Sequence, residues 1–66
     1  IYLNRGFAKV KIKDFQGAID DFSKAIKINP NEFLLYNNRA FAKRKLGDNE
    51  GADEDDRKAE KLKNIF

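Results

Sequence analysis

The chain repeats itself with a period of 34 residues. When residues 1–32 are aligned with residues 35–66, 14 of the 32 pairs are identical, far above chance. The identical pairs are Tyr2/Tyr36, Asn4/Asn38, Arg5/Arg39, Phe7/Phe41, Ala8/Ala42, Lys9/Lys43, Lys11/Lys45, Asp14/Asp48, Gly17/Gly51, Ala18/Ala52, Asp21/Asp55, Lys24/Lys58, Ala25/Ala59 and Lys27/Lys61. A period of this length is typical of stacked helix–turn–helix units. The sequence therefore predicts one domain, 1–66, made of repeat one (1–32) and repeat two (33–66).

Apolar spacing and breaking residues predict four helices, at about residues 1–12, 15–28, 33–46 and 50–63. The second of these carries apolar side chains at i, i+3, i+4 and i+7, which line one face of a helix. Pro30 ends that helix because proline lacks the backbone N–H and restricts the residue before it. Gly47 suits a left-handed C-terminal cap after the third helix. Gly17 and Gly51 lie early in the second and fourth helices, where we expect close packing against a neighbour.

The residue types that are missing exclude many chemistries. A chain of 66 residues forms one small domain. It contains no Cys, His or Met. It therefore has no thiol or imidazole group that could serve as a nucleophile, as an acid–base group or as a metal ligand. No glycine loop for phosphate occurs, and the acidic run 53–56 lacks the spacing of a calcium loop. We expect no enzyme activity, no catalytic residues, no metal and no cofactor, and no apolar run is long enough to span a membrane.

The repeat unit resembles the tetratricopeptide repeat (TPR) family. The matching small, aromatic and proline positions are Tyr2, Gly6, Ala18, Phe22, Ala25 and Pro30 in repeat one, and Tyr36, Ala40, Ala52 and Ala59 in repeat two. The departures are Arg5 and Arg39 at the Leu position, Lys9 and Lys43 at the Tyr position, Asp56 for the large aromatic residue and Asn64 for proline. The resemblance implies an all-α fold of two antiparallel helix pairs in a right-handed superhelical stack. It also implies a protein-interaction function.

In the family that the chain resembles, the first helix of each pair lines a concave groove. Carried over by position, the partner-binding residues are Asn4, Phe7, Lys11, Asn37, Asn38, Phe41, Arg44 and Lys45, with Leu3 and Leu34 beside them. Asn4, Phe7 and Lys11 share one helical face at i, i+3 and i+7, and residues 38, 41 and 45 repeat that spacing. Amides, exposed rings and cations suit a peptide with carboxylates and an apolar anchor. The alternative is that both rings pack between helices and the rest is ordinary surface.

Charge is unevenly distributed over a net charge of +3. The first and third helices are basic, whereas the second and fourth begin with acidic residues, which the helix dipole favours at these ends. The Lys and Arg side chains of the first and third helices repel one another, so an ordinary solvent-exposed surface explains them less well. We therefore predict a positive groove and an acidic protein or peptide partner.

Other functions stay open at this stage. A basic face with aromatic rings can also stack nucleic-acid bases, although the net charge is small and no nucleic-acid motif occurs. A structural or self-assembling segment is a further alternative, because two repeats are below the roughly three usually needed for a stable stack. We expect a homodimer at high concentration. The segment 35–40 resembles a carboxylate-clamp repeat at Asn38, but Phe7 replaces the other clamp Asn.

Between the second and fourth helices, three apolar positions become acidic. Ile19 is replaced by Asp53, Phe22 by Asp56 and Ile26 by Glu60. Terminal repeats of such arrays need a polar outer face. The substitutions therefore predict that repeat two is the last of its array.

Overall fold

The computed structural model describes residues 2–65, with the side chains of residues 3–64. It contains α1 (Tyr2–Lys11), α2 (Phe15–Ile28), α3 (Phe33–Lys45) and α4 (Asn49–Ile65). These bounds agree with the predicted helices to within two residues at every end. The expectations for Ile1, for Phe66 and for the side chains of Tyr2 and Ile65 lie outside the described residues.

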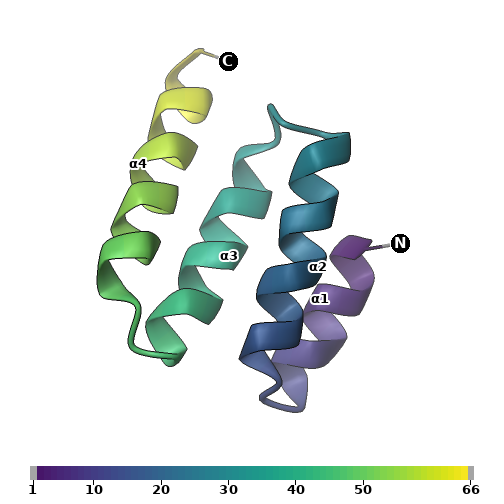
Figure 1. Cartoon of the computed structure of the whole chain (residues 1–66). Helices are drawn as coiled ribbons and strands as arrows, with labels where there is room; N and C mark the ends of the chain where they lie inside the picture. Colours follow the sequence, from purple (N-terminus) through teal and green to yellow (C-terminus); the bar gives the residue numbers. More distant parts are fainter. Residues whose placement is uncertain (1, 66) are drawn as a thin grey trace.

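The helices pack in chain order, α1 on α2, α2 on α3 and α3 on α4. Figure 1 shows successive helices running in opposite directions, with α1 behind α2 and α4 at the opposite edge of the layer. The molecule is a thin slab of 33 × 26 × 15 Å. This arrangement confirms the all-α fold of two helix pairs, whereas the handedness of a longer stack stays a prediction.

Both turns inside the helix pairs use the same C-terminal cap. After α3, Gly47 adopts φ 89°, its N–H donates to the Arg44 carbonyl, and the Asp48 N–H donates to the Lys43 carbonyl. After α1, Lys13 takes the equivalent place with φ 65°, and the Asp14 N–H donates to the Lys9 carbonyl. This hydrogen-bond pattern is a Schellman motif, which favours glycine at the left-handed residue. The cap predicted at Gly47 is confirmed, and Lys13 occupies the same conformation without being glycine.

An aspartate then begins the second helix of each pair. The Oδ1 atom of Asp14 accepts a hydrogen bond from the Gly17 N–H at 3.1 Å, and Asp48 does the same for Gly51 at 3.0 Å. A Cβ atom on either glycine would collide with the capping carboxylate. The close packing expected at these glycines is therefore mainly with the helix's own cap.

Small residues bring the helices together around two apolar clusters. Ala18, Phe22 and Ala42 form the first cluster, and Tyr36, Ala59 and Leu62 form the second. Gly6 is buried against Phe22, and a Cβ atom there would lie 2.5 Å from the Cε1 atom of that ring. Short side chains at such contacts allow interaxial distances of about 8–10 Å.

Candidate partner-binding face

The predicted residues of α3 form an exposed stripe that contains a fixed aromatic ring. Phe41 is 48% exposed and Leu34 is 52% exposed. The Lys45 ammonium lies 5.3 Å from the centre of the Phe41 ring, which is within cation–π range. Asn38 is half-buried one turn before the ring, and Asn37 is exposed at the edge of the stripe. We call Leu34, Asn38, Phe41 and Lys45 the α3 stripe.

α1 carries the corresponding stripe of Asn4, Phe7 and Lys11. All three are exposed, and Phe7 remains 42% accessible. The Phe7 ring meets Phe22 of α2 edge to face with 5.8 Å between the centroids. Phe41 meets Phe15 of α2 in the same manner at 6.5 Å. Each ring therefore packs against α2 and is also partly exposed to solvent, so packing between helices holds in part and a role of these rings in partner binding stays a prediction.

The two stripes lie on helices that are joined through α2. Among the described residues, α1 and α3 each pack on α2, and no direct α1–α3 packing of comparable extent is present. Two hollows lie elsewhere, at the turn of residues 28–32 and on the outer side of α4. A continuous groove between α1 and α3 is therefore a proposal.

Arg44 has an internal role that the sequence did not suggest. Its Nη2 atom lies 2.7 Å from a carboxylate oxygen of Asp53 and 2.7 Å from one of Asp56. These carboxylates raise the pKa of the Arg44 guanidinium. Arg44 thus links α3 to α4 across the surface, and its charge is already engaged within the chain.

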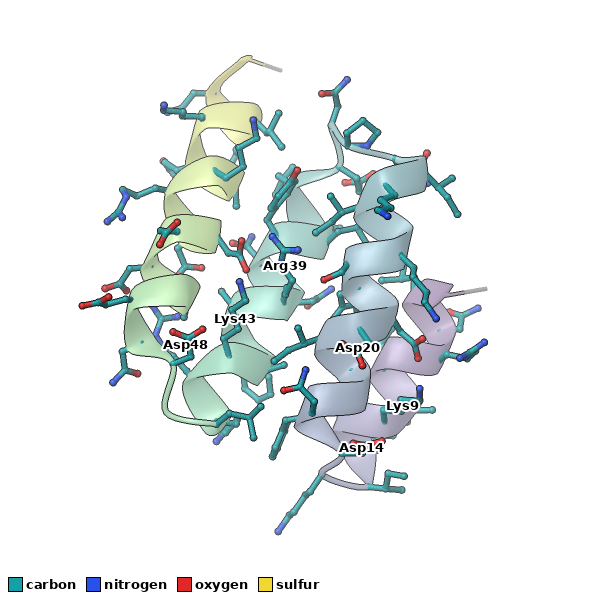
Figure 2. The ribbon with its side chains drawn as sticks, in the orientation of Figure 1. Lys9, Asp14, Asp20, Arg39, Lys43 and Asp48 are labelled. Atoms are coloured by element: carbon teal, nitrogen blue, oxygen red, sulfur yellow. The ribbon has the colours of Figure 1, made fainter. Side chains whose placement is uncertain are left out.

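Four of the residues that depart from the family pattern take part in two equivalent ion clusters, and they are Arg5, Lys9, Arg39 and Lys43. In repeat two, Arg39 and Lys43 of α3 surround Asp55 of α4, which is 5% exposed. Arg39 donates from Nε to Oδ2 at 2.8 Å and from Nη2 to Oδ1 at 2.7 Å, and the Lys43 Nζ lies 3.0 Å from Oδ2. Figure 2 shows the labelled Arg39 and Lys43 between α2 and α4. The Leu and Tyr positions of the family are therefore replaced together by one buried ion network.

Repeat one carries the same cluster in a looser form. Asp21 of α2 is 1% exposed, with Arg5 Nη2 at 3.2 Å from Oδ1 and Lys9 Nζ at 3.0 Å from Oδ2. The Arg5 side chain is itself half-exposed, whereas Arg39 is mostly covered. Asp21 is therefore held by two ion pairs, whereas Asp55 accepts two hydrogen bonds from one guanidinium.

Both buried carboxylates stay ionised because of their cationic neighbours. Burial raises the pKa of Asp21, but the Lys9 ammonium and the Arg5 guanidinium outweigh it, so the pKa falls below its usual value. Burial raises the pKa of Asp55 as well, and hydrogen bonds from Arg39 and Lys43 lower it further than burial raises it. The helix dipole does not explain these two acids, because neither lies in the first turn of its helix. Both aspartates pair with cations of the preceding helix instead.

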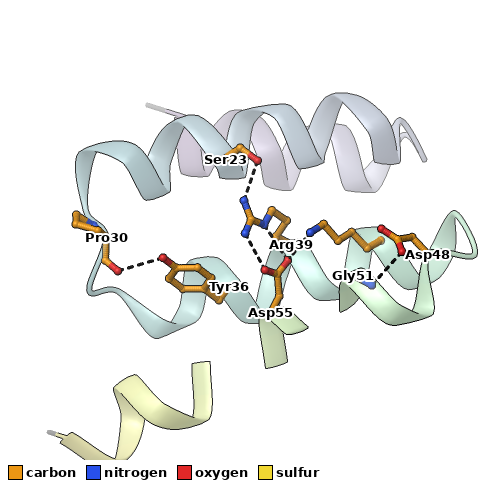
Figure 3. A network of polar contacts seen from close by, with 8 residues as sticks. Ser23, Pro30, Tyr36, Arg39, Asp48, Gly51 and Asp55 are labelled. Carbon is orange, nitrogen blue, oxygen red and sulfur yellow. Dashed lines mark hydrogen bonds and ion pairs between the residues drawn. The ribbon is translucent and has the colours of Figure 1, made fainter. Parts of the chain in front are cut away.

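Arg39 also reaches the repeat before it. Its Nη1 atom donates to the Ser23 hydroxyl of α2 at 3.0 Å, and its guanidinium lies 5.6 Å from the centre of the Tyr36 ring. Figure 3 shows these contacts beside the Tyr36 hydroxyl, which donates to the Pro30 carbonyl at 3.3 Å. The sequence signal for this network is that its three members are identical in the two repeats, as Arg5/Arg39, Lys9/Lys43 and Asp21/Asp55.

Five of the basic residues that suggested a positive groove are thus paired with acids. They are Arg5, Lys9, Arg39, Lys43 and Arg44. Lys11 and Lys45 keep their place on the two stripes as exposed residues. The positive character of the face is therefore carried by fewer side chains than the sequence predicted.

Two further observations concern the remaining classes of site. Within residues 2–65, no helix is long and apolar enough to cross a membrane. The same part of the chain has no group of three acidic residues arranged to hold a metal ion. Neither observation adds a site beside the two stripes.

Comparison with known proteins agrees with the repeat architecture. A sequence profile described as tetratricopeptide repeat matches residues 1–32, and a second profile of the same description matches residues 22–54. No curated protein and no solved structure is significantly similar to the chain. The second match spans the end of α2, all of α3 and the start of α4, so it covers the junction between the repeats. The chain belongs to the tetratricopeptide repeat family, a family of non-enzymatic modules that generally mediate protein–protein interaction.

Proposed function

We propose that this chain is a protein-interaction module that binds a peptide or partner segment along the stripes of α1 and α3. The observation that carries the proposal is the half-exposed Phe41 ring, which packs against the Phe15 ring in a T-shaped contact and has the Lys45 ammonium 5.3 Å from its centre. Exposed aromatic rings that are fixed by the core are typical anchors of interfaces. The same Asn, Phe and Lys recur on α1 at the same spacing.

The chemistry of the stripes defines the partner. An apolar side chain of the partner would contact the rings of Phe7 and Phe41. Lys11 and Lys45 would attract a carboxylate, and the amides of Asn4 and Asn38 would hydrogen-bond its backbone or its carboxylate. A short acidic segment with one apolar anchor meets these requirements. Asn37 would contribute at the rim, whereas Arg44 would first have to leave Asp53 and Asp56.

Selection of peptides from a random display library on the folded chain tests the proposal. The affinity of a selected peptide is then measured for the wild type, Asn38→Ala and Lys45→Glu. Lys58→Glu is the matched control, since it makes the same charge change on the outer side of α4. We expect Lys45→Glu to weaken binding about tenfold or more and Lys58→Glu to leave it unchanged. Equal affinities for all the variants would contradict the proposal.

Two alternatives are separated by simple measurements. Retention on heparin beyond about 0.5 M salt, without binding of any selected peptide, would favour nucleic acid. The expected homodimer stays a prediction, and sedimentation near 100 µM, a concentration suited to weak interfaces, measures it.

A further inference from the structure

The excess positive charge of the chain lies at one end of the molecule. Residues 24–34 and 57–64 carry six bases and two acids, whereas the rest of the chain carries eight bases and nine acids. Figure 1 shows that both segments lie at the same end, opposite the turns that follow α1 and α3. We call this part of the molecule the basic end. Its bases are all exposed, and they are Lys24, Lys27, Arg57, Lys58, Lys61 and Lys63.

The helix dipole explains only two of these six bases. A cation in the last turn of a helix is favourable, and α2 has Lys27 there while α4 has Lys63. The other four bases lie before the last turn of their helix. Lys24 and Lys58 occupy equivalent positions of the two repeats, as do Lys27 and Lys61, so α2 and α4 present the same bases. A negatively charged ligand common to both helices would account for this arrangement.

Two large aliphatic side chains are exposed at the basic end. Ile28 is 64% exposed at the end of α2, and Leu34 is 52% exposed at the start of α3. The turn between them, residues 29–32, is exposed at every position and lines a hollow together with Ile28. The Tyr36 hydroxyl donates to the Pro30 carbonyl at 3.3 Å, which ties this turn to the second apolar cluster. Aliphatic and basic side chains are therefore exposed together at one end of the molecule.

We propose that the basic end binds the surface of a membrane that contains anionic lipids, with Ile28 and Leu34 entering the headgroup region. The negative potential of such a surface attracts Lys and Arg side chains, and buried aliphatic side chains add a second, apolar contribution. A nucleic acid would pair with the bases but would leave both aliphatic side chains in water, because bases stack on aromatic rings. This surface goes beyond the proposed function, since it does not use the asparagine, phenylalanine and lysine side chains of the two stripes.

Sedimentation of the full chain with lipid vesicles tests the proposal. One set of vesicles is phosphatidylcholine alone, and the other contains about 30% phosphatidylserine to supply a negative surface. We expect the chain to sediment with the phosphatidylserine vesicles only. Salt at about 0.5 M should release it, because screening weakens the attraction of exposed charges. Equal binding to both kinds of vesicle, or binding to neither, would overturn the proposal.

Two matched pairs of variants locate the surface. Lys61→Glu and Ile28→Ser change the basic end, whereas Lys13→Glu and Ile12→Ser make the same changes at exposed positions of the opposite end. We expect Lys61→Glu to weaken vesicle binding about tenfold and Ile28→Ser to weaken it about fivefold. Both controls should bind like the wild type, with circular dichroism showing the same fold for all four variants.

Three outcomes would count against the membrane surface. Equal losses in Lys61→Glu and Lys13→Glu would show that only the net charge of the chain matters. Equal binding by Ile28→Ser and Ile12→Ser would show that no side chain enters the headgroup region. Binding of a single-stranded oligonucleotide without binding of the phosphatidylserine vesicles would assign the basic end to nucleic acid.

The outcome is separable from that of the proposed function. Ile28→Ser changes no charge and leaves both lysines of the stripes intact. A selected acidic peptide should therefore keep its affinity for this variant. Weaker vesicle binding with unchanged peptide binding would identify two separate surfaces.

Discussion

The guanidinium of Arg39 on α3 donates two parallel hydrogen bonds of 2.8 and 2.7 Å to the carboxylate of Asp55 on α4. The same guanidinium donates to Ser23 of α2. One side chain thus connects three helices and both repeats. Bidentate pairing of this kind fixes orientation as well as distance.

Removing Asp55 should destabilise the fold more than removing an exposed aspartate of the same helix. We expect Asp55→Asn to lower the free energy of unfolding by about 3 kcal/mol, because Arg39 and Lys43 lose their common partner in a buried place. Small domains have roughly 3–5 kcal/mol in total, so this variant would keep about 0–2 kcal/mol and up to about half of it would be unfolded at 25 °C. Asp53→Asn is the control, since Asp53 is 58% exposed. Urea denaturation followed by circular dichroism measures both, and equal midpoints would show that the cluster adds nothing.

Acid should weaken the fold through the same two aspartates. The pKa values of Asp21 and Asp55 are lower in the folded chain than usual. Their stabilising contribution is therefore complete above the ordinary carboxyl pKa of about 4 and is lost as pH falls through the lower folded values. We expect the free energy of unfolding to be level from pH 7 to 5 and to drop below pH 4. Asp21→Asn should reduce this drop and Asp53→Asn should keep it, whereas identical pH profiles would contradict the assignment.

The two equivalent caps provide a matched pair of backbone substitutions. Lys13 holds φ 65° with a side chain, and Gly47 holds φ 89° without one. We expect Lys13→Gly to stabilise the chain by about 0.5–1 kcal/mol and Gly47→Lys to destabilise it by about 1 kcal/mol, because a Cβ atom is disfavoured in the left-handed region. Thermal unfolding of both variants measures the difference. Changes of the same sign would contradict the equivalence of the two turns.

Substitution of Gly6 by alanine should destabilise the fold, although repeat two has alanine at the equivalent position 40. The neighbour of Gly6 is the Phe22 ring, whereas Asp56 occupies the position equivalent to Phe22 in repeat two. We expect Gly6→Ala to cost about 1–3 kcal/mol through overpacking. Phe22→Leu in the same chain should recover part of that cost in a double-mutant cycle. Additive effects of the two substitutions would show that the contact is not the cause.

The sequence predicted the helices well because each boundary has a local cause. These causes determine the structure within a few residues of their own position, and they are Pro30, Gly47 and the apolar spacing of residues 15–28. The resemblance to the repeat family added the order in which the helices pack. The turn at Lys13 was expected, but its left-handed conformation was not, since lysine carries no local signal for it.

The ion clusters were not predicted because they depend on partners 12 to 16 residues apart that become neighbours only after packing. Arg39 and Lys43 were interpreted as groove charges, and Asp55 was assigned to the helix dipole. Arg44 was assigned to the partner in the same way, and its ion pairs with Asp53 and Asp56 of α4 were not predicted either. The sequence signal for the cluster is the set of Arg, Lys and Asp that repeats at positions 5, 9 and 21 and at positions 39, 43 and 55.

Nuclear magnetic resonance mapping of a selected acidic peptide on the isotope-labelled chain tests the central proposal most directly. We expect backbone shifts to concentrate at Asn4, Phe7 and Lys11 on α1 and at Asn38, Phe41 and Lys45 on α3, and we expect Lys45→Glu to remove them. Shifts that concentrate instead on the outer face of α4, at Glu54, Arg57 and Lys61, would contradict it.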